Sequence, residues 1–228
     1  MALALASHNT RTTQPYTHPP LHPLAPQAAV PTWPRNHAKS FVRVHNGTFA
    51  IGCRRFPVAG WNQWEVLEMG AGMPALYGGS LPTGMTGPAL LRNILDDAAA
   101  AGMTVMRAWA HGVQPDAVLQ VAPGQYNHEL LRGLDYAMDQ ARIRGIRVLL
   151  SLTDNWMYAG GVDQYIDWLG LDAQQYHSRF FIDPRAKALY KAHVQFMLTR
   201  TNMVNGQTCV MLHFCDGTMG IPASQVCA

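Results

Sequence analysis

The chain has 228 residues, of which 48% are hydrophobic and only 14% are charged, and this composition excludes a fibrous protein or one that is disordered throughout. Its 17 basic and 14 acidic side chains give a formal net charge of +3 and form no basic cluster that could follow a phosphate backbone, so no nucleic-acid partner is expected. No apolar run approaches the roughly 20 residues that cross a bilayer, so no membrane partner is expected either.

Residues 1–40 are predicted to form a disordered segment rich in proline and histidine, because they contain no acidic residue and few large aliphatic side chains. The first seven residues have the small and apolar side chains of a signal peptide, but they lack its basic start and the apolar stretch is short, which leaves a cleaved export segment open. The four histidines of this segment are spaced irregularly and predict no metal site: His8, His18, His22 and His37.

A β-hairpin is predicted over residues 41–52. Apolar and polar side chains alternate on both sides of Asn46-Gly47, a pair that accepts the positive φ angles of a type I′ turn. Asn46-Gly47-Thr48 also matches the N-glycosylation sequon, although the turn by itself explains the pair.

Three further strands are predicted as short apolar runs, over residues 56–60, 104–109 and 146–151. Helical spacing of apolar residues predicts helices over residues 90–99 and 130–141, and a third helix begins at Asp183-Pro184. The first two helices each end at a glycine that leads directly into a strand, Gly102 and Gly145, and glycine accepts the left-handed conformation that closes a helix. Strands that alternate with such helices indicate parallel βα units.

Parallel units can close a (β/α)8 barrel or lie in an open, doubly wound sheet. A nucleotide-binding open sheet usually has a glycine-rich turn after its first strand, whereas residues 60–64 read Gly-Trp-Asn-Gln-Trp. The sequence therefore favours the barrel, in which the chemistry gathers in the loops after the strands.

Aromatic and polar side chains occur together at all three predicted strand ends. The set comprises Trp61, Asn62, Trp64, Arg107, Trp109, His111, Asp154, Asn155, Trp156 and Tyr158. Indole rings stack on the apolar faces of sugars while amide and guanidinium groups bind paired hydroxyls, so the combination indicates carbohydrate binding. For any single residue the alternative is structural, since tryptophans often belong to the core and an arginine can simply join two loops.

Several motifs in order along residues 41–203 resemble the plant and fungal endo-β-1,4-mannanases of glycoside hydrolase family 5. They are Phe41-Val42-Arg43, the residues 58–62, 104–110, 133–136 and 141–152, Asp154-Asn155-Trp156, the residues 160–165, and the residues 181–202. The resemblance implies a (β/α)8 TIM-barrel type fold, a β-mannan or related polysaccharide as partner, no cofactor and no metal, and retaining hydrolysis of internal β-1,4-mannosidic bonds by two glutamates.

The sequence also departs from that family. The family's acid/base glutamate follows the fourth strand in an Asn-Glu-Pro segment and its nucleophile follows the seventh, but none of the three glutamates here, Glu65, Glu68 and Glu129, matches either position. The stretch from Phe41 onward is shorter than the roughly 250 residues of a complete barrel. We therefore expect an incomplete barrel, about its first half, over residues 41–203, an atypical tail over residues 204–228, and no mannanase activity from this chain alone.

The resemblance assigns substrate binding to Arg107, Trp109, Asn155 and Trp156, and the strand-end pattern adds Trp61 and Asn62. Arg107 matches the arginine that helps to keep the nucleophile ionised, and no catalytic residue is assigned. His193 lies among core positions of a helix and is interpreted as a packed or surface histidine.

Two other hypotheses stay open: a catalytically dead carbohydrate-binding protein, and a non-functional truncated translation product. The resemblance implies secretion, although no convincing signal peptide is found.

Overall fold

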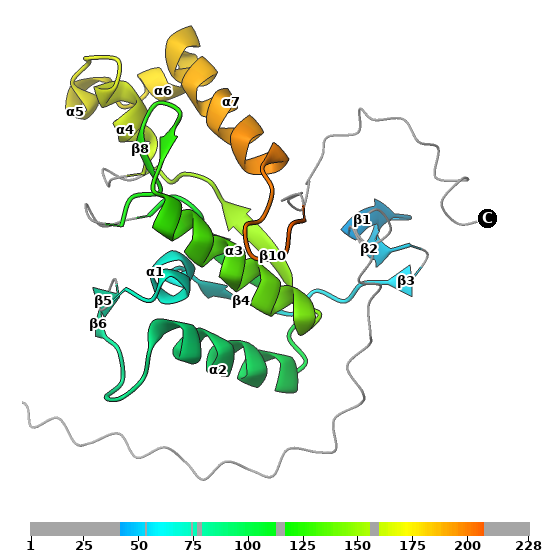
Figure 1. The fold of residues 1–228 in the computed structure, drawn as a ribbon. Helices are drawn as coiled ribbons and strands as arrows, with labels where there is room; N and C mark the ends of the chain where they lie inside the picture. The colour runs from blue at the N-terminus through cyan, green and yellow to red at the C-terminus, as the bar shows by residue number, and fades with distance from the viewer. Residues whose placement is uncertain are drawn as a thin grey trace, which may run out of the picture.

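The computed structural model describes residues 42–52, 54–73, 75–76, 79–112, 117–155 and 160–207. The predicted hairpin is confirmed: β1 (Val42–His45) pairs antiparallel with β2 (Thr48–Ile51), and the turn holds Asn46 and Gly47 at φ values of 48° and 73°. The short β3 (Arg54–Arg55) extends this sheet. Ile51 and Phe56 pack with Val105, the first residue of β7, so the hairpin lies at the amino end of the main sheet (Figure 1).

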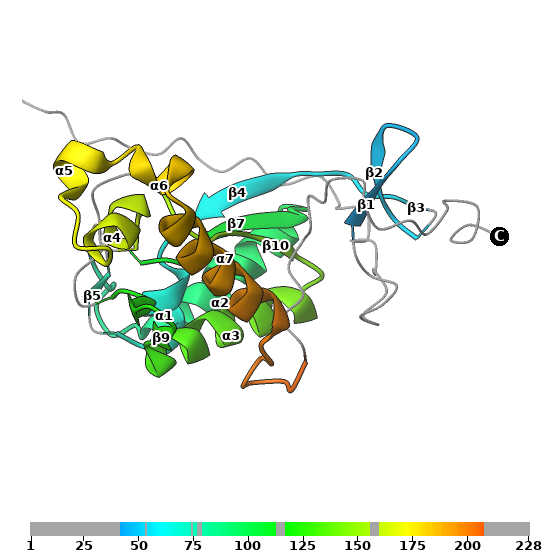
Figure 2. The ribbon, with the colours of Figure 1, turned by 90° about the horizontal axis from the view of Figure 1, so that it is seen from above.

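The main sheet consists of β4 (Gly60–Gln63), β7 (Val105–Trp109) and β10 (Arg147–Ser151), in the order β10-β7-β4. Both pairings are parallel, as predicted, and the three strands lie side by side in the order in which they follow along the chain. The connections run through α2 (Gly87–Ala100) and α3 (His128–Ile143), and Figure 2 shows both on the same side of the sheet. Each strand is followed by a helix on the same face of the sheet and then by the neighbouring parallel strand. This is the arrangement of a (β/α)8 barrel, of which the described residues form an unclosed part.

The first strand is displaced from its predicted position, residues 56–60, and begins only at Gly60. The Thr104 hydroxyl donates to the Pro57 carbonyl (2.8 Å) and accepts from the Ala59 N–H (3.0 Å), and the Thr104 N–H donates to the Ala59 carbonyl (2.7 Å). These bonds hold residues 57–59 before the regular ladder begins at Gly60. Pro57 has no N–H to offer to such a ladder. Trp61 and Asn62 consequently lie within β4 and not in the loop after it.

The two long helices end as their glycines predict. The Gly102 and Gly145 N–H groups donate to Ala99 and Arg142, and the next N–H groups reach back to Ala98 and Ala141. Both glycines have a φ of 75°, which completes a Schellman motif twice. The third predicted helix is α7 (Pro184–Thr199), where the Asp183 carboxylate caps the first turn by accepting from the Arg185 N–H (2.9 Å).

Short elements fill the connections. They are α1 (Val66–Ala71), β5 (Ala75–Leu76), β6 (Gly79–Ser80), β8 (Gln120–Ala122), β9 (Gln125–Tyr126), α4 (Val162–Asp167), α5 (Ala173–Tyr176) and α6 (Arg179–Ile182). The main core lies between the sheet and helices α1 to α3, and includes Leu67, Leu91, Met106 and Leu134. A second cluster packs α4 to α6 against α7 around Tyr165 and Phe180. The sheet is thus covered on one face, and its carboxyl end meets the α4 to α6 region (Figure 1).

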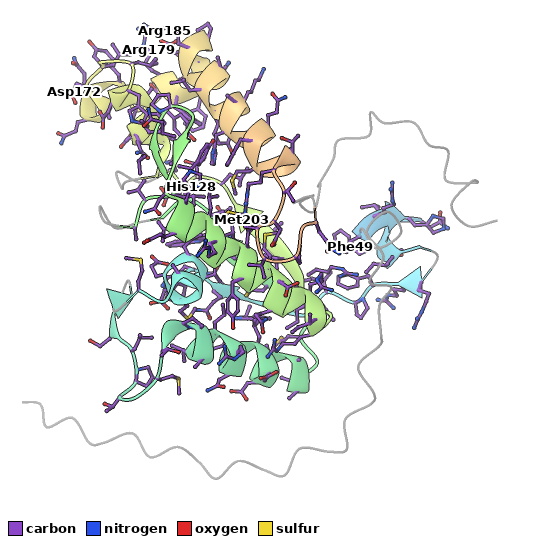
Figure 3. The ribbon with its side chains drawn as sticks, in the orientation of Figure 1. Phe49, His128, Asp172, Arg179, Arg185 and Met203 are labelled. Atoms are coloured by element: carbon purple, nitrogen blue, oxygen red, sulfur yellow. The ribbon has the colours of Figure 1, made fainter. Side chains whose placement is uncertain are left out.

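The segment after α7 returns to α3. Asp135, fully buried, forms an ion pair with Arg200 and accepts from the Met203 N–H (2.8 Å), and Figure 3 shows Met203 beside α3. Asn202 donates to the Asp135 carbonyl (3.0 Å) and caps the following turn through Val204. These contacts fix residues 200–207 against the outer helix layer.

Candidate carbohydrate-binding site

Asn62 and Arg107 meet on one face of the sheet. The two residues are register partners in β4 and β7, and the Arg107 guanidinium donates to Asn62 Oδ1 at 2.6 Å. Both side chains are exposed, and the face that bears them is opposite to the face packed on the core. A guanidinium has five N–H donors in a planar fork, so this bond orients Arg107 and leaves further donors for a ligand.

Aromatic rings adjoin this pair at the carboxyl end of β7. The Trp109 ring lies 6.2 Å from Trp64 at a 39° tilt and stacks on His111 at 5.2 Å, with 25° between the planes. Trp64 is 40% exposed and so presents an indole surface to solvent. An exposed and a half-buried indole beside a guanidinium and an amide suit the apolar face and the hydroxyls of a sugar ring.

The structure separates Trp61 from this group. Trp61 is the register partner of Met106, which is fully buried, and its ring packs against the main core. Side chains alternate between the faces of a strand, so Trp61 and its neighbour Asn62 point to opposite sides. Trp61 therefore belongs to the packing under the helices.

Asn155 lies in the loop after β10, and its side chain is exposed. The loop is closed by the Thr153 hydroxyl, which donates to the Gly160 carbonyl (3.0 Å), and by the Val162 N–H, which donates to the Asp154 carbonyl (2.9 Å). Asn155 Oδ1 faces the Nε2 atom of His177 at 3.1 Å. Trp156 and Tyr158, also predicted here, lie outside the described residues.

His111 connects the Trp109 ring to the Asp154 carboxylate. Its Nδ1 atom lies 2.9 Å from the Gly112 carbonyl and 4.0 Å from Asp154 Oδ2. Burial lowers the pKa of His111, and nearby Arg107 acts in the same direction, while the Gly112 carbonyl and Asp154 oppose the shift. Burial thus favours the neutral ring, whose Nδ1–H donates to the Gly112 carbonyl.

A buried polar group that the sequence did not reveal lies behind His111. A small cavity is lined by His111, Gln120, Gln164, Tyr165 and His193, among others. The Tyr165 hydroxyl donates to Gln120 Oε1 (3.0 Å), and Gln164 accepts from the Gly160 N–H and donates to the Gln120 carbonyl. Gln164 and Tyr165 are neighbours in α4, but Gln120 of β8 and His193 of α7 are distant from them in sequence, so no local spacing marks the group.

His193, for which the sequence left a packed and a surface position open, is packed in this region. It is 2% exposed, and its Nδ1 atom lies 3.1 Å from the Tyr126 hydroxyl. Burial lowers its pKa to about 4, against a raising effect of the Leu152 carbonyl. Burial likewise raises the pKa of Tyr126 to about 12. Neither group changes charge near neutral pH.

The three glutamates lie on other elements than the Arg107 strand. Glu65 is the N-cap residue of α1, directly after Trp64, and burial raises its pKa. Glu68 is buried within α1, and Glu129 is exposed in the first turn of α3. Among the described residues, no group of three or more His, Cys, Asp or Glu side chains is arranged to hold a metal ion. Within the same ranges, no helix is both long and apolar enough to cross a membrane.

Comparison of the sequence with those of known proteins shows the family of this chain. The sequence model described as GH family 5 beta-mannosidase-like matches residues 39–210. Mannan endo-1,4-beta-mannosidase 1 of Oryza sativa is 42% identical over 115 residues, which are 49% of this chain and 27% of the relative. Mannan endo-1,4-beta-mannosidase 1 of Arabidopsis thaliana is 34% identical over 163 residues, 71% of this chain and 36% of the relative.

Solved structures agree on the fold. The glycoside hydrolase family 5 mannosidase from Rhizomucor miehei superposes with a TM-score of 0.64 at 23% identity, over 76% of this chain and 46% of that one. The endo-beta-1,4-mannanase from Thermotoga petrophila gives a TM-score of 0.54 at 22% identity, over 69% of this chain and 33% of that one. The chain spans only about a quarter to just over a third of the length of the curated relatives named above. The chain belongs to the glycoside hydrolase family 5 β-mannosidase-like family, and its fold is an unclosed part of that family's (β/α)8 barrel.

Proposed function

We propose that this chain carries part of the β-mannan-binding cleft of a mannan endo-1,4-β-mannosidase and that residues 1–228 alone bind the polysaccharide without cleaving it. The observation that carries the proposal is the Arg107–Asn62 pair, at 2.6 Å, beside the Trp64, Trp109 and His111 rings. The names of the plant relatives supply the substrate class. Secretion, which the family resemblance implies, stays a prediction.

The absence of cleavage follows from the chemistry of retention. A retaining glycosidase needs one carboxyl group to protonate the leaving oxygen and a second, about 5 Å away, to attack the anomeric carbon. The sequence has no glutamate at either matching position. Arg107 and the indoles can bind a sugar, but binding that does not favour the transition state over the substrate gives no rate.

Calorimetric titration of the purified chain with mannohexaose tests binding. Wild type should bind, and Arg107→Ala and Trp109→Ala should each weaken binding about tenfold or more, because they remove a charged donor and a stacking surface. Arg132→Ala is the matched control, since Arg132 is exposed on α3, a helix that covers the face of the sheet opposite to Arg107. Equal affinities for all four proteins, or no binding by wild type, would contradict the proposal.

Activity is tested by extension of the chain. Residues 41–203 joined in frame to the later strands of a related mannanase should release reducing ends from β-mannan, and Arg107→Ala should depress that rate strongly. The unextended chain should release none. If it does, the catalytic carboxylates have been misidentified, and Asp154, which contacts His111 at the rim, is the first to replace by Asn.

A further inference from the structure

His177 is bonded through both ring nitrogens to residues far from it in sequence. Its Nδ1 atom pairs with Asp163 Oδ1, and its Nε2 atom lies 3.1 Å from Asn155 Oδ1. Asp163 belongs to α4 and is 5% exposed, whereas the His177 side chain, at the C-cap of α5, is 33% exposed and Asn155 is exposed at the sheet end. A chain of three polar groups thus runs from a buried carboxylate to a proposed sugar-binding amide.

The first bond determines which ring nitrogen always carries a proton. A carboxylate only accepts hydrogen bonds, so the Nδ1 atom of His177 donates to Asp163. The Nε2 atom is then an acceptor in the neutral ring and a donor in the imidazolium. A primary amide can meet either state, because rotation by 180° exchanges its carbonyl and its NH2 group.

We propose that His177 is a positioning residue that sets which edge of the Asn155 amide faces the cleft. With a protonated ring, Nε2 donates to Oδ1, the contact seen in the structure, and the NH2 group faces outward to donate to a sugar hydroxyl. With a neutral ring, the NH2 group turns to Nε2 and the carbonyl faces outward to accept from a hydroxyl. The sugar as ligand rests on the proposed function, whereas the rotation of the amide does not.

Asp163 is the charged group that bonds to the His177 ring, and Phe181 of α6 meets it edge-on at 6.5 Å between centroids. Other charged groups on the packed elements have contacts of their own: Asp154 approaches His111, and Asp172 caps α5. Arg179 lies over the Tyr176 ring at 6.0 Å, and Asp167 is exposed. Figure 3 labels Asp172 and Arg179.

The amide itself reports the rotation without any ligand. In the full chain with 15N-labelled asparagine, the side-chain NH2 signal of Asn155, assigned as the signal lost in Asn155→Ala, should shift between pH 8 and pH 5. His177→Gln should abolish this shift. His128→Gln, which removes an exposed histidine at the start of α3, should leave it unchanged (Figure 3). A signal that does not respond to pH in wild type, or that responds equally in His177→Gln, would overturn the proposal.

Mannohexaose binding supplies the second readout. The wild-type affinity should change about threefold to tenfold across the pH range of the NMR shift, the effect of one hydrogen bond, and the profile should be flat in His177→Gln. In the Asn155→Ala background, His177→Gln should cause no additional change in affinity. If the role of His177 were merely structural, the second substitution would weaken binding further. If wild type binds no mannohexaose while the NH2 signal still follows His177, the proposed function fails and the positioning role stands.

Discussion

Burial of His193 links the stability of the protein to pH. The ring is 2% exposed, and its pKa is lowered to about 4 because burial disfavours the imidazolium. The unfolded chain binds a proton near pH 6.5, the folded chain only near pH 4. Between these values the unfolded state holds more protons, so the free energy of unfolding falls as the pH falls.

We expect His193 to cost wild type up to about 3 kcal/mol of stability between pH 6.5 and pH 4. His193→Gln keeps an acceptor for the Tyr126 hydroxyl but cannot be protonated, so its urea-unfolding free energy should fall less over this range. Aspartates of lowered pKa, such as Asp183, act on both proteins alike at lower pH. His128→Gln should follow wild type, and parallel profiles for wild type and His193→Gln would exclude a neutral buried His193.

The ion pair between Asp135 and Arg200 differs from the surface pairs in its burial. The two side chains are 0% and 7% exposed, whereas the side chain of Asp96 in its pair with Arg144 is 62% exposed. Removal of one partner from a buried pair leaves an uncompensated charge, which costs much more than the loss of an exposed pair.

Asp135→Asn should therefore lower the free energy of unfolding by about 3–5 kcal/mol, whereas Asp96→Asn, which breaks a solvent-exposed pair, should lower it far less. Both changes remove one carboxylate from an aspartate–arginine pair, so denaturant unfolding compares them directly. Because Asp135 also binds the segment after α7, hydrogen exchange at residues 200–207 should increase in Asp135→Asn alone. Equal costs would show that Arg200 finds another anion.

At the scale of elements, α1 and α3 pack backbone to backbone through glycines. A Cβ atom built on Gly133 would lie 2.4 Å from the Leu67 carbonyl oxygen and 2.6 Å from the Ala71 nitrogen, and one on Gly70 would lie 2.1 Å from the Gly133 oxygen. These neighbours are backbone atoms, so they cannot move aside as a flexible side chain would. The close approach lets α1, in the loop after β4, lie under the sheet.

Gly133→Ala should destabilise the protein by about 1–3 kcal/mol through overpacking, although alanine is the better helix former by about 1 kcal/mol. Thermal unfolding followed by circular dichroism measures the effect. Arg132→Ala, one position earlier on the exposed side of α3, should remain within about 0.5 kcal/mol of wild type. A stabilised Gly133→Ala would mean that the two helices separate readily.

At the scale of the whole molecule, the sheet has two outer strands. In the described part of the chain, β4 and β10 each pair with β7, and the exposed large apolar side chains include Phe181 and Ile182, at 54% and 61%. Unpaired strand edges and exposed apolar surface promote association between chains.

We therefore expect the isolated chain to be oligomeric or poorly soluble, as measured by size-exclusion chromatography with light scattering. The fusion of residues 41–203 to the later strands of a related mannanase should be monomeric, because those strands pair with the edges. A monodisperse monomer of the isolated chain with a sharp, cooperative thermal transition would instead favour a self-contained carbohydrate-binding module.

The sequence alone determined the features that depend on neighbours in the chain. Asn46-Gly47 specified the hairpin turn, Gly102 and Gly145 closed two helices, and the order of strands and helices indicated parallel βα units. In each case the cause is local: a φ angle that few residues accept, or a periodic apolar face. The fold class and the family followed from these patterns and from the motifs between them.

Only the tertiary structure decided the features that depend on distant residues. Thr104, more than forty positions away, sets where β4 begins, and that register turns Trp61 to the core and Asn62 to Arg107. His177 reaches Asn155 across 22 positions, and no periodicity links them. The physical reason is that packing chooses among side-chain directions that the local backbone permits equally, so the sequence named most of the candidate site but not which of its members face the same side.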